Sequence, residues 1–333
     1  MDRLNLCIWF ETTKVPWGGS NQFLSALVKE LTRMGHQVSH LPNPHQTQIV
    51  LINAFLNAPG RYICSRQIAQ LKQTGRVTKL GKWIPQFLWL LQRRRGPILV
   101  HRLDGIAELY RGQRSKADAI QPVVNQLTDY TIFQSIYCRE SFAQHGIRPP
   151  RSSLIYNGVD PSIFYPPARG LVPSPVSRLV AVSWSNNPRK GFATLAQFSR
   201  IPGIEIRFVG HWSPSIDPAR VILMGIKSSL ELAQIMRQSH AMIHAAENEP
   251  CSNTIVEALA CGLPVLFRDS GGNRELAGNY GVALTDDLEA DIQKLRTSYN
   301  ELRDKILVDR PRFLISRAAQ EYVKVFQQAL DLD

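Results

Sequence analysis

Two glutamates, Glu249 and Glu257, are separated by seven residues across the boundary between a predicted loop and a predicted helix. The backbone N–H groups of Ser252, Asn253 and Thr254 would lie at the start of that helix, where they have no partner within the helix and the helix dipole is positive. Such a helix start suits a phosphate group. The two carboxylates beside it could accept hydrogen bonds from sugar hydroxyls. The stretch therefore predicts a site for a phosphate that carries a sugar.

A structural alternative exists for the same stretch. Thr254 and Glu257 have the spacing of a capping box, in which two side chains only satisfy N–H groups at a helix start. Gly262 and Pro264 would then simply end the helix. The stretch alone leaves both interpretations open.

Two further loops of the second half carry residues suited to phosphate. Lys190, followed by Gly191, comes after the first predicted strand of that half, and Gly271 and Gly272 come after a later one. Parallel strands of an open sheet bind ligands beyond their carboxyl ends, so we expect these loops to lie beside Glu249. Their convergence favours a binding site over a helix cap alone.

The elements that must position these loops alternate along the whole chain. Short apolar runs typical of strands are followed by segments of helical periodicity, which predicts an α/β protein with two doubly wound domains in tandem. The proline-rich stretch 161–175 predicts a linker. We expect a first domain at 1–165, a second at 166–312 and a last helix at 313–333. The predicted strands are Leu4–Phe10, Gln37–Leu41, Gln48–Asn53, Ile98–Arg102, Thr131–Gln134, Leu179–Trp184, Glu205–Val209, Val221–Leu223, Ala241–His244 and Pro264–Phe267. The predicted helices are Ser20–Met34, Ser115–Leu127, Ile136–His145, Phe192–Arg200, Ser229–Ser239, Thr254–Ala260, Glu289–Asn300 and Phe313–Leu330.

The charge of the 333-residue chain is concentrated in its first half. The whole chain has 39 basic and 27 acidic side chains, a net charge of +12. Residues 1–165 contain 20 basic and 9 acidic side chains, which leaves 19 and 18 for the second half. The excess predicts an anionic partner for the first half, whether phosphate, lipid or nucleic acid.

The cysteines and the apolar runs indicate the compartment. Five cysteines, widely spaced and without a Cys-x-x-Cys pair, argue against a disulfide framework and a zinc cage. No run reaches the 18 or so apolar residues of a membrane span, and the first ten residues do not resemble a signal peptide. We therefore expect a cytoplasmic protein with reduced thiols.

In these motifs the second half resembles the donor domain of family-4 glycosyltransferases, enzymes of the GT-B fold. Their signature is E-x7-E followed by A-x-x-x-G-x-P-V, and Glu249 and Glu257 match its two glutamates. The stretch 154–166 is similar to the family's domain junction, and Gly18 and Gly19 stand where the family has a Gly-Gly loop. The resemblance covers nearly the whole chain. It implies two Rossmann-like domains facing a cleft, a last helix that crosses back to the first domain, and sugar transfer from a nucleoside-diphosphate donor with retention of anomeric configuration.

The resemblance also implies roles for single residues. Glu257 would hydrogen-bond the nucleotide ribose, and Glu249 would contact the transferred sugar. Lys190, Gly18 and Gly19 would lie on the diphosphate. Lys190 and helix N–H groups could stabilise the leaving diphosphate without a metal, and the chain has no Asp-x-Asp motif to hold one. We therefore expect a metal-independent enzyme without a cofactor, which binds a nucleoside-diphosphate sugar as donor and a glycan, lipid-linked or polymer acceptor.

One departure from the family concerns a second phosphate-binding cation. The family commonly has an arginine five or six residues before the lysine, where this chain has Ser185 and Trp184. Arg189 is the obvious substitute, since a turn led by Pro188 could bring it beside Lys190. The alternative is that Arg189 is a solvated loop residue.

In the first half, His101 and Asp104 come at the end of a predicted strand, the edge that faces the cleft in this fold. Similar enzymes place a histidine after a first-domain strand beside the transferred sugar, so we expect His101 to be catalytic. Asp104 would orient His101 or the acceptor hydroxyl. Arg102 would contact phosphate or acceptor. A histidine at a strand end can also be purely structural.

The basic segment 79–95 suggests a partner. Its tryptophans beside lysines and an arginine triplet suit an interfacial helix on an anionic membrane or a grip on an anionic, lipid-linked or glycan acceptor. A core helix is the alternative. Two other functions compete with the transferase: a basic nucleic-acid-binding protein, which no recognised nucleic-acid-binding motif supports, and a GT-B protein that binds sugar nucleotides without catalysis.

Overall fold

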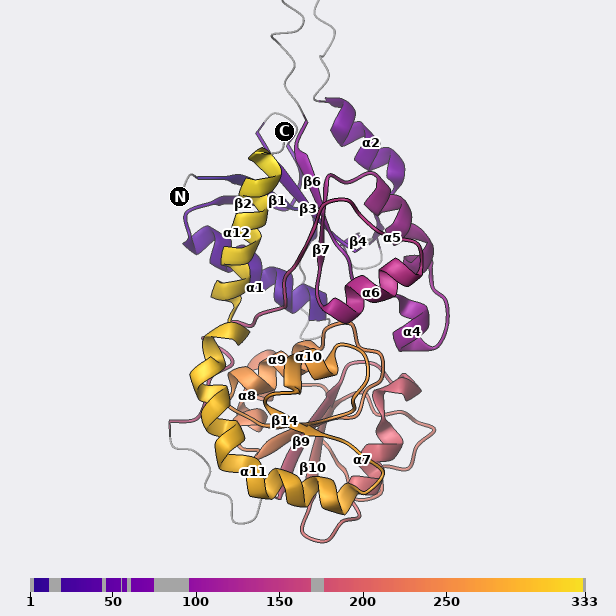
Figure 1. Cartoon of the computed structure of the whole chain (residues 1–333), viewed down its shortest axis with the longest axis vertical. Helices are drawn as coiled ribbons and strands as arrows, with labels where there is room; N and C mark the ends of the chain where they lie inside the picture. Colours follow the sequence, from indigo (N-terminus) through magenta and orange to yellow (C-terminus); the bar gives the residue numbers. More distant parts are fainter. Residues whose placement is uncertain are drawn as a thin grey trace, which may run out of the picture.

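The computed structural model describes residues 3–11, 19–43, 46–54, 56–58, 61–74, 96–168 and 177–331. They form two α/β domains, one above the other along the long axis (Figure 1), and each is built around one parallel six-stranded sheet. The predicted pair of doubly wound domains is confirmed. The basic segment 79–95 lies outside the described residues.

The first sheet has the order β2-β1-β3-β6-β7-β8, with every neighbouring pair parallel. The chain therefore changes direction across the sheet between β1 and β3, the position at which open α/β sheets bind ligands. Five of the six strands were predicted; β8 is short and lies at the edge. The strands are β1 (Asn5–Ile8), β2 (Gln37–Ser39), β3 (Ile49–Asn53), β6 (Ile98–Arg102), β7 (Tyr130–Phe133) and β8 (Ser152–Leu154), and a separate antiparallel pair is formed by β4 (Leu56–Ala58) and β5 (Arg61–Tyr62). The helices are α1 (Gly19–Arg33), α2 (Ser65–Thr74), α4 (Ala107–Arg111), α5 (Lys116–Gln126) and α6 (Ile136–Gln144).

The second sheet has the order β11-β10-β9-β12-β13-β14, which is the Rossmann order with its change of direction between β9 and β12. Only β14 was not predicted. The strands are β9 (Arg178–Ser183), β10 (Glu205–Gly210), β11 (Ile222–Leu223), β12 (Ala241–His244), β13 (Val265–Phe267) and β14 (Gly281–Ala283). The helices are η1 (Pro188–Lys190), α7 (Phe192–Phe198), α8 (Ser229–Arg237), α9 (Asn253–Ala260), α10 (Asn273–Ala277) and α11 (Leu288–Asp309).

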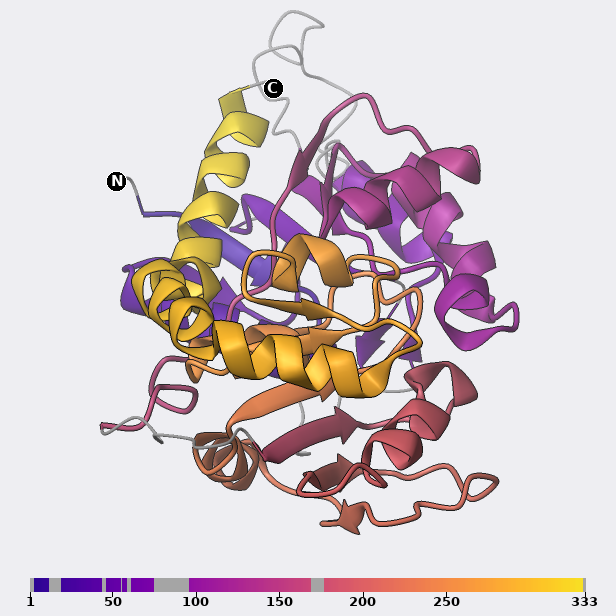
Figure 2. The ribbon, with the colours of Figure 1, turned by 60° about the horizontal axis from the view of Figure 1, so that its bottom comes forward.

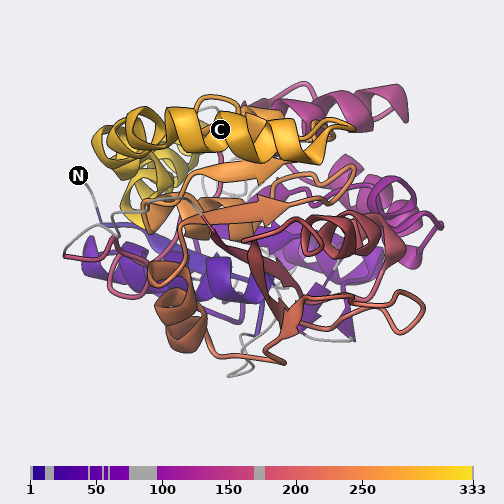
Figure 3. The same cartoon turned by 90° about the horizontal axis from the view of Figure 1, so that it is seen from below.

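Both faces of the second sheet are covered, because successive strand residues point to opposite sides. Leu179 and Ala181 of β9 pack in a cluster with α7 and α11, whereas Val180 and Val182 pack in a cluster with α8 and α9. Figures 2 and 3 show α11 and α8 on opposite sides of these strands. Burial on both faces explains why the strands read as continuous apolar runs.

The chain crosses between the domains twice. After η2 (Arg310–Phe313), helix α12 (Ile315–Asp331) returns to the first domain and packs against α1, where Tyr322 lies 6.1 Å from Phe23 between ring centroids. The return of the last helix is thus confirmed. The crossings lie side by side: the Val159 N–H donates to the Phe313 carbonyl at 3.0 Å, and the Ile315 N–H donates to the Val159 carbonyl at 2.9 Å.

Candidate functional site

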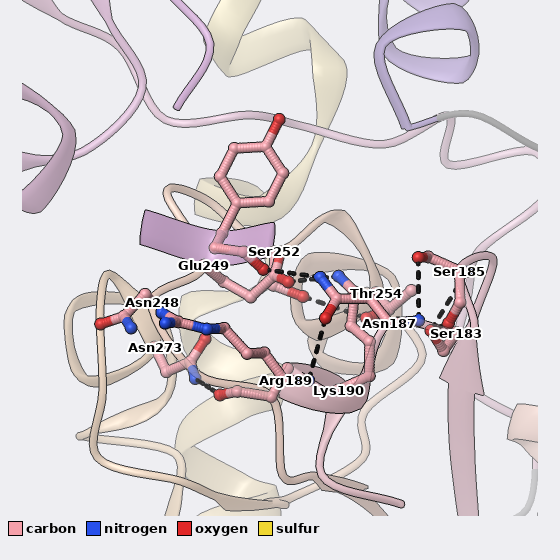
Figure 4. A network of polar contacts seen from close by, with 12 residues as sticks. Ser183, Ser185, Asn187, Arg189, Lys190, Asn248, Glu249, Ser252, Thr254 and Asn273 are labelled. Atoms are coloured by element: carbon pink, nitrogen blue, oxygen red, sulfur yellow. Dashed lines mark hydrogen bonds and ion pairs between the residues drawn. The ribbon is translucent and has the colours of Figure 1, made fainter. Parts of the chain in front are cut away.

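Three loops of the second domain meet at one edge of its sheet. They leave the carboxyl ends of β9, β12 and β13, which are neighbours in the sheet, and they lead to η1, α9 and α10. Figure 4 shows Lys190, Glu249 and Ser252 together, with Ser183 at the end of β9 beside them. The loop of Lys190 and the loop of Glu249 therefore lie side by side, as expected from the order of the strands.

Lys190 and Glu249 form an ion pair at the centre of this edge, in which the Lys190 Nζ donates to the Glu249 Oε1. The side chains are only 20% and 13% exposed. Solvent screening of the pair is reduced at such burial, so its charges act strongly on any ligand that enters. A phosphate that binds Lys190 has to compete with Glu249.

The start of α9 differs from the capping-box alternative, which is wrong. The N-cap is Ser252, whose Oγ accepts from the Ile255 N–H at 3.4 Å. Thr254 instead places its Oγ1 3.0 Å from the Ser252 Oγ. Glu257 takes no part in capping, so its carboxylate is available for another role.

The Glu257 carboxyl group is buried, and its Oε2 has no hydrogen-bond partner among the residues that the structure describes. Burial raises the pKa of Glu257 to about 8, because desolvation disfavours the charged form. An unpaired buried oxygen is costly unless a ligand satisfies it. Glu257 lines a cavity of about 140 Å³ between α1, the domain junction and α9, together with Gln22, Phe23, Ser25, Ala26, Lys29, Gly158, Val159, Asp160, Ile163, Phe164 and Asn253.

The glycine pair after β13 holds the loop of Glu249. Gly271 has a φ of +64°, and a Cβ atom there would lie 2.6 Å from the Glu249 carbonyl oxygen. The Gly272 N–H donates to that oxygen at 2.8 Å. The pair was predicted to bind the donor; in the structure it packs on the backbone that carries Glu249.

The first domain brings Asp104 to the boundary with this edge. A Cβ atom on Gly105 would lie 2.7 Å from the Pro250 side chain, so the two loops touch. Tyr110 lies near both Asp104 and Glu249: burial raises the pKa of Tyr110, and these two carboxylates raise it further. Gly18 lies outside the described residues, and Gly19 begins α1.

His101 does not reach this boundary, contrary to its predicted catalytic role. Its ring is fully buried in the first domain, with Nε2–H donating to the Ala54 carbonyl at 2.6 Å and Nδ1 accepting from the Asn125 Nδ2 at 3.2 Å. Burial lowers the pKa of His101 to about 4. Both ring nitrogens are occupied, so we assign the histidine a structural role.

Arg102 was predicted to contact phosphate or acceptor, but in the structure it is buried, with only 1% of its surface exposed. Its guanidinium donates to side-chain amides, those of Asn53, Gln134 and Asn157.

Arg189 turns away from Lys190 and bridges the domains. Its Nη1 donates to the Leu109 carbonyl in α4. Asn187 reaches the same helix, with its Nδ2 donating to the Tyr110 carbonyl at 2.9 Å. The structure therefore does not bring Arg189 to the predicted phosphate site as a second cation.

Glu275 bridges the domains, a role that the sequence did not predict although Glu275 ends the motif Ser270-Gly-Gly-x-x-Glu275. Its carboxylate accepts from the backbone N–H groups of Ile136 at 2.8 Å and Tyr137 at 2.7 Å, at the start of α6, and from the Tyr156 hydroxyl at 2.9 Å. Its place after Gly271-Gly272 was the only available signal. The contact fixes the glycine loop against the first domain.

The described ranges hold neither a cluster of metal-ligating side chains nor a membrane-spanning helix. They contain no group of three or more histidine, cysteine, aspartate or glutamate residues placed to hold a metal ion. None of the helices in these ranges is both long and apolar enough to cross a bilayer.

Residues 218–306 match the family model of glycosyl transferases group 1. A GDP-mannose-dependent alpha-mannosyltransferase of Mycobacterium tuberculosis is 30% identical over 165 residues, 46% of this chain and 42% of that protein. A D-inositol 3-phosphate glycosyltransferase of Mycobacterium bovis is 26% identical over 214 residues, 55% of this chain and 45% of that protein. The matches thus span less than half the length of these two relatives.

Similar solved structures cover nearly the whole chain. Sucrose-phosphate synthase from Thermosynechococcus elongatus has a TM-score of 0.66 at 16% identity, over 99% of this chain and 100% of that one. Anabaena HepE in complex with UDP-glucose has a TM-score of 0.65 at 17% identity, over 98% of this chain and 100% of that one. The chain therefore has the GT-B fold of glycosyltransferases, and its similarity to the glycosyl transferases group 1 family lies in residues 218–306.

Proposed function

We propose that this chain is a glycosyltransferase that moves a sugar from a nucleoside-diphosphate donor to an acceptor held mainly by residues 1–165. The observation that carries the proposal is the buried Glu257 carboxyl group, whose Oε2 has no described partner and which lines a cavity beside the start of α9. A ribose hydroxyl would satisfy that oxygen. The relatives that carry the names of mannosyl and inositol-phosphate glycosyltransferases support a sugar-nucleotide donor.

The proposed mechanism is electrostatic. As the donor enters, Lys190 leaves Glu249 and binds the diphosphate. The first N–H groups of α9, at the positive end of the helix dipole, also bind the diphosphate. Glu249 is then free to accept hydrogen bonds from sugar hydroxyls. Asp104, whose neighbour Gly105 packs against Pro250 across the domain boundary, would orient the acceptor hydroxyl. Transfer would retain the anomeric configuration, which NMR of the anomeric proton in the product tests directly.

A binding measurement separates this function from the nucleic-acid-binding alternative. Calorimetric titration with UDP, GDP and ADP should give saturable binding of at least one diphosphate. The same protein should bind RNA and DNA only weakly and with strong salt dependence, because a basic surface alone supplies non-specific attraction. Tight, salt-resistant nucleic-acid binding without nucleotide binding would favour the nucleic-acid-binding alternative.

Transfer should persist in EDTA. Lys190 and the N–H groups at the start of α9 would carry the diphosphate charge in place of a divalent cation. Rates measured in EDTA should match those with added magnesium. Complete loss in EDTA, with recovery on adding magnesium or manganese, would contradict metal independence.

The basic first half supports an anionic acceptor, either lipid-linked or a glycan, and the segment 79–95 would contact it or an anionic membrane. Sedimentation with anionic vesicles tests the membrane version. Binding should fall with salt and with the change of Arg93, Arg94 and Arg95 to serine. Equal recovery in the supernatant with and without anionic lipid would contradict it.

We also propose a cytoplasmic location, since all five cysteines are free thiols and reducing compartments keep thiols in that state. Fractionation of cells that express the protein tests this location: recovery from an oxidising compartment, with disulfides formed, would contradict it.

A further inference from the structure

Arg102, the last residue of β6, is a buried cation surrounded by amides. Its Nη1 donates to the Asn53 Oδ1 at 2.6 Å, and its Nη2 donates to the Gln134 Oε1 at 2.6 Å and to the Asn157 Oδ1 at 2.8 Å. Its Cζ lies 4.6 Å from the ring centroid of Phe23. None of the ion pairs found within the described ranges includes Arg102.

A guanidinium has only donors, and this fixes the orientation of each amide around it. Gln134 and Asn157 must turn their oxygens toward Arg102, which leaves their NH2 groups to donate elsewhere. One N–H of the Asn157 Nδ2 goes to the Gln134 Oε1 at 3.1 Å, so the two amides are also linked to each other. The Gln134 Nε2 then donates to the Asp104 Oδ1 at 3.1 Å and to the Leu103 carbonyl at 2.8 Å. The Asn157 Nδ2 donates to the Asn253 Oδ1 at 2.7 Å.

These contacts form two directed chains that end in the proposed site. One runs from Arg102 through Asn157 to Asn253, the first residue of α9. Because the Asn253 oxygen is already used, Asn253 has its NH2 group left to offer to a ligand, and that group suits a phosphate oxygen. The other chain runs through Gln134 to Asp104, which accepts the hydrogen bond and is thereby held as an acceptor.

The groups that accept hydrogen bonds from Arg102 are amides and not carboxylates, and this choice indicates a role beyond neutralising its charge. A carboxylate would neutralise Arg102 and lower the cost of burying its charge. A carboxylate could not, however, accept from Arg102 on one side and donate to Asn253 or Asp104 on the other. An amide accepts with its oxygen and donates with its nitrogen, so it passes the direction of the hydrogen bonds onward.

We propose that Arg102 is a positioning residue: it sets the hydrogen-bond direction of Asn253 and Asp104 and so makes Asn253 a donor to the diphosphate of the sugar nucleotide. This inference rests on the proposed function. In this account Asn157 connects Arg102 to Asn253 in the second domain. Gln134 connects Arg102 to Asp104 in the first domain.

Three matched substitutions test the inference, because each gives the same guanidinium a carboxylate partner and removes a different NH2 group. Asn157→Asp should raise the Kd for the bound nucleoside diphosphate about tenfold, the equivalent of one hydrogen bond. Gln134→Glu should leave that Kd within about twofold and slow transfer about tenfold at saturating donor. Asn53→Asp, the control, should change neither. Asn53→Asp should melt at or above the temperature of the wild type, since it adds a countercharge to Arg102. The other two add the same countercharge but lose donated hydrogen bonds, so they should melt below the control.

A double-mutant cycle separates the relay from simple charge repulsion. In an Asn253→Ala background, Asn157→Asp should have no further effect on diphosphate binding, because Asn157 then has no Asn253 side chain to orient toward the ligand. An equal weakening in both backgrounds would overturn the inference, and so would equal affinity of the Asn157→Asp and Asn53→Asp variants. Failure of the wild type to bind UDP, GDP or ADP would overturn the proposed function itself, so the two failures are distinguishable. If Asn157→Asp does not fold, the Gln134→Glu and Asn53→Asp pair decides: equal transfer rates overturn the inference.

Discussion

Replacement of Lys190 by methionine should reduce sugar transfer about 10²–10³-fold, the usual effect of removing one preorganised group that stabilises developing charge. Lys190 is the cation that the structure places at the convergence of the β9 and β12 loops, and the leaving diphosphate gains negative charge there. Its effect should fall mainly on the transfer rate at saturating donor, measured as release of nucleoside diphosphate.

The Lys190 variant also leaves the largely buried Glu249 without its ion-pair partner, so a fall in melting temperature is expected. The double variant Lys190→Met, Glu249→Gln should recover thermal stability and remain inactive. Lys227→Met is the control, because Lys227 belongs to a surface pair with Glu231 at 3.9 Å and should be silent. A double variant that regains transfer along with its stability would show that Lys190 acts through folding alone.

Above about pH 8, where the Glu257 carboxyl group is charged, Glu257→Gln should weaken donor binding by about 1.5–3 kcal/mol. This is the range of a charge-assisted hydrogen bond and corresponds to roughly a 10–150-fold rise in Kd. Calorimetric titration of the nucleotide that binds the wild type measures the effect. Glu301→Gln, at an exposed position of α11, is the matched control and should bind the nucleotide normally.

The same variant should be more stable than the wild type at alkaline pH. Burial holds the pKa of Glu257 at about 8 in the folded protein, against 4.5 for an exposed glutamate. Between those values the folded protein binds one more proton than the unfolded chain, so its free energy of unfolding falls as the pH rises from about 4.5 to about 8. Glutamine cannot ionise and escapes this loss. Urea unfolding at pH 8.5 should therefore show the variant more stable, and a variant that melts early yet binds nucleotide normally would contradict the binding role.

Most of the fold follows from local sequence patterns, and the exceptions have a physical cause. The central strands of both sheets are buried on both faces, so they read as apolar runs of β-branched residues. The edge strands β8 and β14 are Ser-Ser-Leu and Gly-Val-Ala, too short and too polar or small to give such a signal. Helices α2, α4 and α10 were missed as well: α4 and α10 have only five residues each, and α2 is largely polar.

The meeting of the second-domain loops was predictable, because each of their motifs follows a strand of one parallel sheet. The topology then brings Lys190 and Glu249 together whatever the loop details. The orientation of side chains at a strand end was not predictable. All five residues of β6 are buried, so neither periodicity nor position told whether His101 and Arg102 turn toward the domain boundary or toward the covering helices.

Turnover of a sugar nucleotide at this site is the central claim, and one side-by-side assay tests it most directly. Wild-type protein and the Lys190→Met variant are incubated with UDP-, GDP- and ADP-sugars, and released nucleoside diphosphate is measured over time. We predict that the wild type slowly hydrolyses at least one of these donors even without an acceptor and that the variant does not. Release at equal rates by both proteins, or by neither with any donor, would contradict the claim.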